Sequence, residues 1–254
     1  MITLKTAEEV EILRENALLV SKTLAEVGKR VKPGVTTLEL DRLAETFIRD
    51  HGAVPGFLGY EDFPNTLCLS VNDVVVHGIP SKYELKEGDI LSVDCGTIYK
   101  GYYGDSAYTF AVGEVSEAVR QLMRVTRESL FKGIAQALEG NRVGDISAAI
   151  QGHVEAFGYG VVREMVGHGI GKNMHEKPDI PNYGKRGNGK RLREGMVICI
   201  EPMINEGTHE VFLESDGWTL RTKDSKPSAH YELTVCIKKG QPEVLSTFEF
   251  IEQN

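Results

Sequence analysis

Four acidic residues interrupt apolar, strand-like runs of this sequence. They are Asp94 in residues 90–99 (ILSVDCGTIY), Asp105 in 102–112 (YYGDSAYTFAV), Glu201 in 196–201 (MVICIE) and Glu232 in 231–237 (YELTVCI). For Glu201 or Glu232 alone, a carboxylate at a strand end that faces water is the simpler explanation. Four charges in apolar runs would be costly, however, unless protons or cations neutralise them. The four acids are therefore candidate ligands of metal ions.

The two aspartates are predicted to lie on neighbouring strands. The runs that hold them read as strands joined by a tight turn at Lys100-Gly101. With that turn, Asp94 faces Ala107. Asp105 then faces Gly96. Because side chains alternate along a strand, both carboxylates point to one face as diagonal neighbours, about 7–8 Å apart at the backbone. A bulge in the second strand would break this geometry.

One histidine completes the candidate set. We expect His168 to lie in a glycine-flanked turn, Gly167-His168-Gly169. Four carboxylates and one imidazole form a hard, oxygen-rich set of donors for two divalent ions. Such a set of donors is more typical of sites for Mn, Fe or Co than of structural zinc sites, which are built from thiolates, although it does not exclude zinc.

An internal repeat indicates how the acids are positioned. Residues 34–52 (GVTTLELDRLAETFIRDHG) match residues 140–158 (GNRVGDISAAIQGHVEAFG), and both read as helices with the same apolar stripe. Further on, Leu-Lys-Glu-Gly precedes Asp94 as Leu-Arg-Glu-Gly precedes Glu201. The matched carboxylates argue against a chance similarity of amphipathic helices. The sequence therefore predicts an α+β domain built from two pseudo-twofold-related halves.

A further helix is predicted at the start of the chain. Thr6 and Glu9 have the spacing of a capping box, apolar residues follow at helical intervals, and Pro33-Gly34 ends the segment. We expect residues 7–29 to be helical.

Composition and charge restrict the class of protein. The chain has 254 residues, of which 41% are hydrophobic and 26% charged, which is typical of a soluble globular protein. No apolar run approaches the roughly 20 residues of a membrane span. The polar, acidic start lacks the apolar core of a signal peptide, so we expect a cytoplasmic protein. The net charge of −8 argues against a general nucleic-acid-binding surface.

The four cysteines are expected to be free, buried thiols. Each lies in an apolar run, and none forms a Cys-x-x-Cys pair; they are Cys68, Cys95, Cys199 and Cys236.

Over nearly its whole length the sequence resembles the type I methionine aminopeptidases. Residues 165–183 (MVGHGIGKNMHEKPDIPNY) are similar to the signature segment of that family. The family's five metal ligands match, in order, Asp94, Asp105, His168, Glu201 and Glu232. Flanking motifs agree, among them Val76-His77-Gly78-Ile79-Pro80, Ile200-Glu201-Pro202-Met203 and Ser228-Ala229-His230-Tyr231-Glu232.

The resemblance implies a fold and a domain organisation. The family has the pita-bread (creatinase/aminopeptidase) fold, two pseudo-twofold-related α+β halves around a dinuclear metal site. We expect residues 1–254 to form a single catalytic domain, with halves at about 30–130 and 131–240.

The resemblance also implies an activity. The family removes the N-terminal methionine from nascent proteins when the second residue is small and uncharged, by hydrolysis with a water activated by two divalent metals. Co, Mn, Fe, Zn or Ni would suit the ligands. By resemblance, Glu201 is both a ligand and the general base, Asp94 helps to hold the α-amine, and His77 and His175 contact the scissile peptide and stabilise the tetrahedral intermediate.

The pocket for the methionine side chain is expected to combine aromatic rings with sulfur. Its predicted lining is Tyr60, Phe63, Cys68, Met174 and Trp218, with Phe57 at its edge and His77 and His175 beside it. Positions 57, 63 and 174 carry Phe, Phe and Met, where a familiar bacterial pattern has Cys, Tyr and Phe. The remaining histidines, His51, His153, His209 and His230, are interpreted as structural or surface residues.

Two further expectations concern ions and partners. Asn72, Val74 and Ser228 align with a monovalent-cation site, for Na or K, that type I enzymes make largely from backbone oxygens. The basic segment Lys185–Arg193 (KRGNGKRLR) is either a solvated loop or a contact with the ribosome. We expect a monomer whose substrates are the N-termini of nascent polypeptides.

Two other functions fit parts of the sequence. A proline-specific dipeptidase or aminopeptidase of the same fold usually carries an extra N-terminal domain, whereas the catalytic pattern here begins at about residue 7. A non-catalytic binding relative would be marked by lost ligands, and this chain keeps all five.

Overall fold

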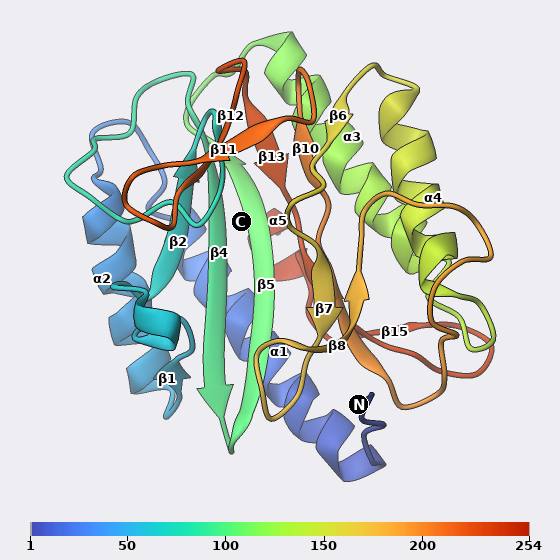
Figure 1. The fold of residues 1–254 in the computed structure, drawn as a ribbon. Helices are drawn as coiled ribbons and strands as arrows, with labels where there is room; N and C mark the ends of the chain where they lie inside the picture. Colours follow the sequence, from blue (N-terminus) through green and yellow to red (C-terminus); the bar gives the residue numbers. More distant parts are fainter. Residues whose placement is uncertain (1, 254) are drawn as a thin grey trace.

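A long β-hairpin runs through the middle of the molecule (Figure 1). In the computed structural model, which describes residues 2–253, β4 (Ile90–Tyr99) and β5 (Tyr102–Ala111) pair in continuous antiparallel register. The turn residues Lys100 and Gly101 have φ values of 50° and 79°, which a type I′ hairpin turn requires. The predicted turn and register are therefore confirmed, and Gly104 is paired without a bulge.

Within residues 2–253 the strands form four sheets, and each pair of strands in them is antiparallel. The hairpin sheet adds β1 (Val54–Pro55) and β2 (Leu67–Val71), both paired with β4. A five-stranded sheet has the order β15 (Glu243–Val244), β14 (Leu233–Cys236), β9 (Val197–Ile200), β7 (Gly167–Gly169) and β8 (Glu176–Ile180). Two three-stranded sheets contain β13 (Ser228–His230), β10 (Met203–Asn205) and β6 (Gly160–Val161), and β11 (Val211–Leu213), β12 (Leu220–Thr222) and β3 (Val74–Val76).

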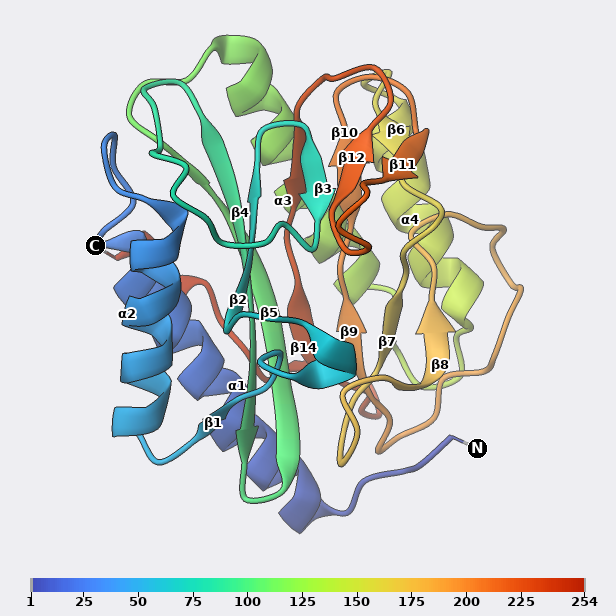
Figure 2. The ribbon, with the colours of Figure 1, turned by 60° about the vertical axis from the view of Figure 1, so that its left-hand side comes forward.

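The helices cover the sheets in two groups, which Figure 2 shows on opposite sides. They are α1 (Ala7–Gly28), α2 (Thr37–Asp50), the short 3-10 helix η1 (Tyr60–Asp62), α3 (Glu117–Ile134), α4 (Val143–Glu155) and the short α5 (Glu249–Glu252). α1 and α2 pack on the hairpin sheet, whereas α3 and α4 pack on the strands of the second half. The predicted first helix and its Thr6–Glu9 capping box are confirmed.

The repeated sequence segments fold into equivalent helices. Residues 34–52 contain α2 and residues 140–158 contain α4, as predicted. Their matched apolar stripes are buried: Leu40, Ala44 and Ile48 in α2, and Ile146, Ile150 and Val154 in α4. α2 belongs to one hydrophobic core and α4 to another, and Tyr108 of β5 packs against both.

The two halves meet along a seam, which we define as residues 105–109 of β5 against residues 230–234. Ala107 and Glu232 exchange backbone hydrogen bonds at 2.9 and 3.4 Å. The Thr234 hydroxyl donates to the carbonyl of Asp105 at 2.8 Å, and the Thr109 hydroxyl donates to that of His230 at 2.7 Å. The seam is therefore a direct hydrogen-bonded junction.

Two strand boundaries differ from the prediction. Glu201 follows the end of β9 instead of lying within it, because Pro202 cannot donate to a strand ladder. Glu232 lies between β13 and β14, where the chain passes from the sheet of β10 to that of β9. Both carboxylates consequently lie at breaks in the ladders.

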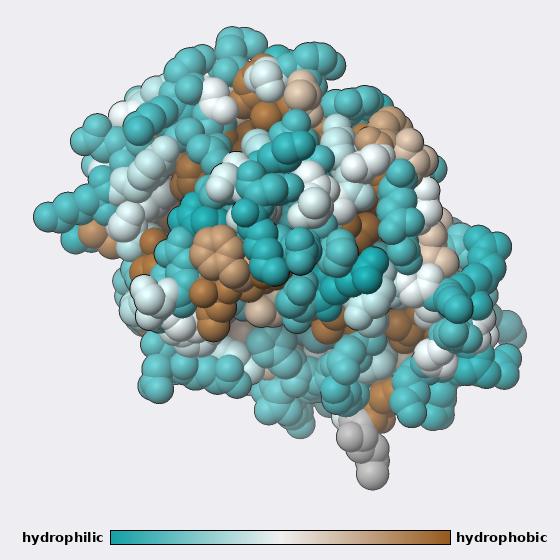
Figure 3. Space-filling view, turned by 45° about the horizontal axis from the view of Figure 1, so that its top comes forward, coloured by the Kyte–Doolittle hydropathy of each residue, from teal (hydrophilic) through white to brown (hydrophobic). Residues whose placement is uncertain are grey.

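The surface is mainly polar where it is drawn in Figure 3, with hydrophobic residues in small, separate groups. None of the helices formed by residues 2–253 has the length and hydropathy that crossing a membrane requires.

Candidate metal centre and substrate pocket

The five predicted ligands lie together beside the seam. Asp94, Asp105 and Glu232 each place a carboxylate oxygen within 4.8 Å of the other two. His168 Nε2 lies 3.7 Å from Asp105 Oδ2 and 3.6 Å from Glu201 Oε1. The aspartates come from β4 and β5, and the glutamates from the two breaks in the ladders. His168 comes from β7, so the prediction of a turn at this residue was wrong; Gly167 and Gly169 pair with the neighbouring strands β8 and β9. Both halves thus contribute to one cluster.

Burial and mutual repulsion make this cluster a poor place for negative charge alone. Burial raises the pKa of Asp94 to about 7. Burial, followed by the charges of Glu232 and Asp94, raises the pKa of Asp105 well above its usual value. The pKa values of Glu201 and Glu232 are raised well above theirs, first by burial and then by neighbouring acids. Burial lowers the pKa of His168 to about 4, so its imidazole is neutral near pH 7 and fit to ligate a metal.

The unpaired oxygens fit divalent cations. Asp94 Oδ1, Asp105 Oδ1 and Glu232 Oε1 are buried and have no hydrogen-bond partner within residues 2–253. Buried acceptors left without a partner are costly, and bound cations would satisfy them. Four carboxylates with one imidazole are donors that first-row divalent ions accept.

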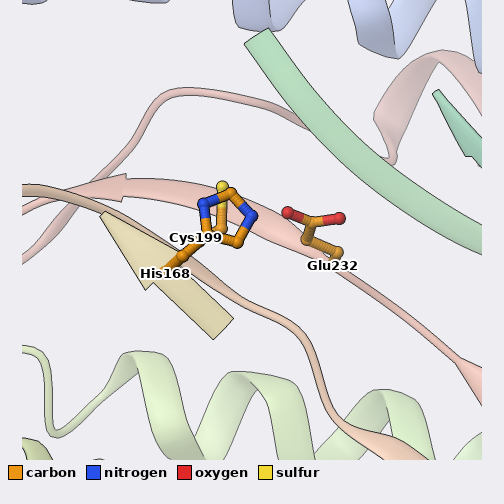
Figure 4. Close-up of side chains that lie close together, drawn as sticks. All are labelled: His168, Cys199 and Glu232. Carbon is orange, nitrogen blue, oxygen red and sulfur yellow. The ribbon is translucent and has the colours of Figure 1, made fainter. Parts of the chain in front are cut away.

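A thiol lies behind the ligands, as Figure 4 shows. Cys199 Sγ lies within 4.8 Å of the nearest ligand atoms of His168 and Glu232, and 3.6 Å from Thr234 Oγ1. All four cysteines are buried and free, as predicted. The nearness of Cys199 to the ligands was not predicted, although its place two residues before Glu201 was a usable signal.

An apolar cavity lies beside the five donors. The residues predicted to line the methionine pocket all line it: Phe57, Tyr60, Phe63, Cys68, Met174 and Trp218. Phe63 and Trp218 meet edge to face, with ring centroids 5.1 Å apart. The ring of Phe57 rests on Gly96 of β4, where a Cβ would collide with it. Additional lining residues that the sequence did not indicate are Glu61, Val76, Met165, Val166 and Met203.

The two histidines expected to contact substrate border the same cavity. His175 Nδ1 lies 2.8 Å from the Tyr60 hydroxyl, and its ring centroid is 4.5 Å from that of His168. His77 has a φ of 58°, a left-handed value that is uncommon for a residue with a Cβ and often marks a functional site. Burial lowers the pKa of His77 to about 4.

His230 corrects the interpretation made from the sequence. It is only 2% exposed, lines the cavity and places Nε2 3.7 Å from Glu201 Oε2. Burial, followed by the charge of His77, lowers its pKa to about 3. Its position two residues before Glu232, on the same face of the chain, was the signal that could have revealed it. His51, His153 and His209 do not line the cavity.

The residues proposed for the monovalent cation lie near one another. Ser228 N–H donates to the carbonyl of Asn72 at 2.9 Å, and Val74 begins β3, which packs against β13. Asn72 has a φ of 54° and its side-chain amide donates to Asp89 at 2.8 Å.

The basic segment Lys185–Arg193 is largely exposed. Its five cationic side chains make no ion pair with any acid of residues 2–253; they are Lys185, Arg186, Lys190, Arg191 and Arg193. Leu192 is buried and anchors the segment in the core of the second half.

Comparisons with known proteins agree with this architecture. The model of metallopeptidase family M24 matches residues 11–239. A methionine aminopeptidase of Clostridium acetobutylicum is 54% identical over 250 residues, which cover 98% of this chain and 100% of the relative. The crystal structure of a methionine aminopeptidase from Thermotoga maritima superposes with a TM-score of 0.96 at 44% identity, covering 97% of this chain and 100% of that one.

A more distant structure shares the fold alone. The Xaa-Pro dipeptidase from Bacillus anthracis has a TM-score of 0.79 at 23% identity, and the match covers 96% of this chain but 62% of the dipeptidase. The five converging donors, the pita-bread fold and the full-length matches lead to one conclusion. The chain belongs to metallopeptidase family M24, among the methionine aminopeptidases.

Proposed function

We propose that this chain removes the N-terminal methionine from polypeptides whose second residue is small and uncharged. Two divalent ions would be held by Asp94, Asp105, His168, Glu201 and Glu232. The observation that carries the proposal is the convergence of these five donors beside a pocket of aromatic rings and sulfur. Aromatic faces and a thioether are favourable surroundings for a methionine side chain.

Each residue of the site has a separate role in the proposed hydrolysis. Bound divalent ions would bring the pKa of a water close to neutral and polarise the methionyl carbonyl. Glu201, whose carboxylate is within reach of His168 and His230, accepts the proton of the attacking water. Asp94 holds the α-amine, which restricts cleavage to the end of a chain.

The flanking histidines stabilise the oxygen on which charge develops. The Tyr60 hydroxyl lies 2.8 Å from Nδ1 of His175. In the tautomer that we propose, this hydroxyl donates to Nδ1, and Nε2 carries the ring proton that it donates to the developing oxyanion. His77 is neutral at pH 7, since its pKa is lowered to about 4, and a neutral ring still provides one N–H donor.

A comparison of peptides tests the proposal. Met-Ala-Ser should be hydrolysed after addition of Mn or Co, and an Xaa-Pro dipeptide should not. Hydrolysis of the Xaa-Pro peptide alone would indicate a proline-specific dipeptidase. Metal analysis of protein purified without added metal would identify the native ions and their number.

We further propose that the enzyme is a cytoplasmic monomer that meets its substrates at the ribosome through Lys185–Arg193. The exposed, unpaired cations of that segment support this proposal, since they suit the phosphates of RNA. Sedimentation with ribosomes should be lost at high salt and in a Lys190→Glu/Arg191→Glu variant.

We also propose two pseudo-twofold-related halves within a single domain, and a Na or K ion near Asn72, Val74 and Ser228.

A further inference from the structure

A buried ion pair joins the N-terminal segment to the first residue of β8. Lys5 Nζ lies 2.6 Å from Glu176 Oε2, and the two side chains are only 3% and 13% exposed. The Lys100–Glu15 pair, in contrast, has side chains 48% and 43% exposed. A buried charge that loses its partner is strongly unfavourable, so each partner of the Lys5–Glu176 pair restricts the position of the other.

Backbone contacts hold the N-terminal segment that carries Lys5 in place. The backbone N–H of Lys5 donates to the carbonyl of Gly195, two residues before β9, at 2.7 Å. Ile2 forms a bridge with Lys177, next to Glu176. Figures 1 and 2 show the N-terminal segment running from α1 toward β8. Lys5 is therefore a fixed point for the residues that contact it.

The glutamate organises the loop of residues 171–175, which directly precedes it. Its Oε1 accepts a hydrogen bond from the N–H of Asn173 at 3.3 Å. A Cβ at Gly171 would lie 2.5 Å from both Glu176 Oε1 and Lys5 Nζ, so a side chain at this position would displace the ion pair. The carbonyl of Gly171 accepts from the N–H of Tyr103 at 2.8 Å, which joins the loop to β5.

The same loop presents two residues to the cavity. Met174 is 2% exposed and belongs to the apolar cluster of the pocket. His175, directly before Glu176, lies 2.8 Å from the Tyr60 hydroxyl through Nδ1. We propose that Lys5 is a positioning residue for the reaction, which holds Met174 and His175 against the cavity through Glu176. This inference rests on the proposed role of His175.

Replacement of the lysine by an uncharged side chain of similar length tests the inference. Lys5→Met should lower kcat for Met-Ala-Ser by about 10- to 100-fold, because small displacements of a catalytic group are costly. Metal content should be unchanged, since Lys5 contacts none of the five donors. Lys5→Arg keeps the charge and should restore kcat to within about threefold of the unaltered enzyme. Lys100→Met, which breaks the exposed pair, is the matched control and should leave kcat unchanged.

A second readout does not depend on activity. In long-range ¹H–¹⁵N spectra of the imidazole rings, the signals of His175 should shift in Lys5→Met and stay in place in Lys100→Met. Glu176→Gln, which retains an oxygen for the Asn173 N–H, should reproduce the Lys5→Met result if Lys5→Met does not fold. Unchanged kcat and His175 signals in folded Lys5→Met would overturn the inference. If the unaltered enzyme fails to cleave Met-Ala-Ser, the proposed function fails, and the spectra alone still decide whether Lys5 positions His175.

Discussion

Phe57→Ala should change which side chain the pocket accepts while leaving the metal ligands in place. Phe57 is 7% exposed, and its ring packs on Gly96 at the edge of the cavity. We expect the linear methionine side chain to fit beside this ring and the branch of leucine to collide with it. Gly96 pairs with Asp105 across the hairpin, so the ring can be removed without changing the backbone that carries the ligand.

The expected magnitude follows from the size of the change. A methylene or a branch in such a pocket alters the transition-state free energy by about 1–3 kcal/mol, or about 5- to 150-fold in kcat/KM. The unaltered enzyme should therefore prefer Met to Leu by a factor in this range, with weak turnover of norleucine. Phe57→Ala should reduce the Met:Leu ratio by about tenfold. The same change costs on the order of 3–5 kcal/mol of stability when a ring is fully buried, so the assay requires a parallel melting curve.

The assay compares Met-Ala-Ser with Leu-Ala-Ser at equal metal content. Phe157→Ala provides the matched control, because Phe157 is 40% exposed and does not line the cavity. An unchanged Met:Leu ratio in folded, metal-loaded Phe57→Ala would refute the reasoning. Equal turnover of the two peptides by the unaltered enzyme would refute the pocket itself, though not the aminopeptidase activity.

Three other predictions concern the metal centre. Asp105→Ala and Glu232→Ala should each abolish activity and lower the amount of bound metal, as measured by elemental analysis. Full metal content with near-normal activity in either variant would contradict the ligand assignment. Glu201→Gln should lose turnover with at least one metal ion still bound. His175→Ala should instead lower kcat at unchanged metal content. Loss of metal from His175→Ala would show that the role proposed for His175 is wrong. Without metal, the pKa of Asp94 is raised to about 7, so the folded protein retains protons that the unfolded chain has released. Above about pH 6.5, where unfolded histidines no longer oppose this effect, the melting temperature of the metal-free protein should fall as pH rises, and added Mn should abolish the fall.

The parts of the fold that depend on local pattern could be predicted. The turn at Lys100-Gly101 fixed the register of a hairpin whose side chains alternate, so the relation of Asp94 to Asp105 followed. The same holds for the helix capped by Thr6 and Glu9, because capping residues and helical periodicity are adjacent in sequence.

The parts that depend on contacts between distant segments could not be predicted in the same way. The break between β13 and β14 at Glu232 arises because the chain changes sheets, which no local pattern reveals. Cys199 and His230 read as an ordinary buried thiol and an ordinary histidine in the sequence. The assembly of distant strands of the second half brings Cys199 to His168 and Glu232, and His230 to Glu201. The pairing of Lys5 with Glu176 spans 171 residues and leaves no periodic signal.

The seam between residues 105–109 and 230–234 has a thermodynamic consequence. Asp94 and Asp105 lie on one side of it, and His168, Glu201 and Glu232 lie on the other. If both groups hold the same ion, as we propose, its binding free energy would add to the association of the two halves. Metal occupancy and the cooperativity of unfolding are coupled in this arrangement. The metal-bound protein should unfold as one unit, and removal of metal by a chelator should weaken the junction between the halves before it weakens either hydrophobic core.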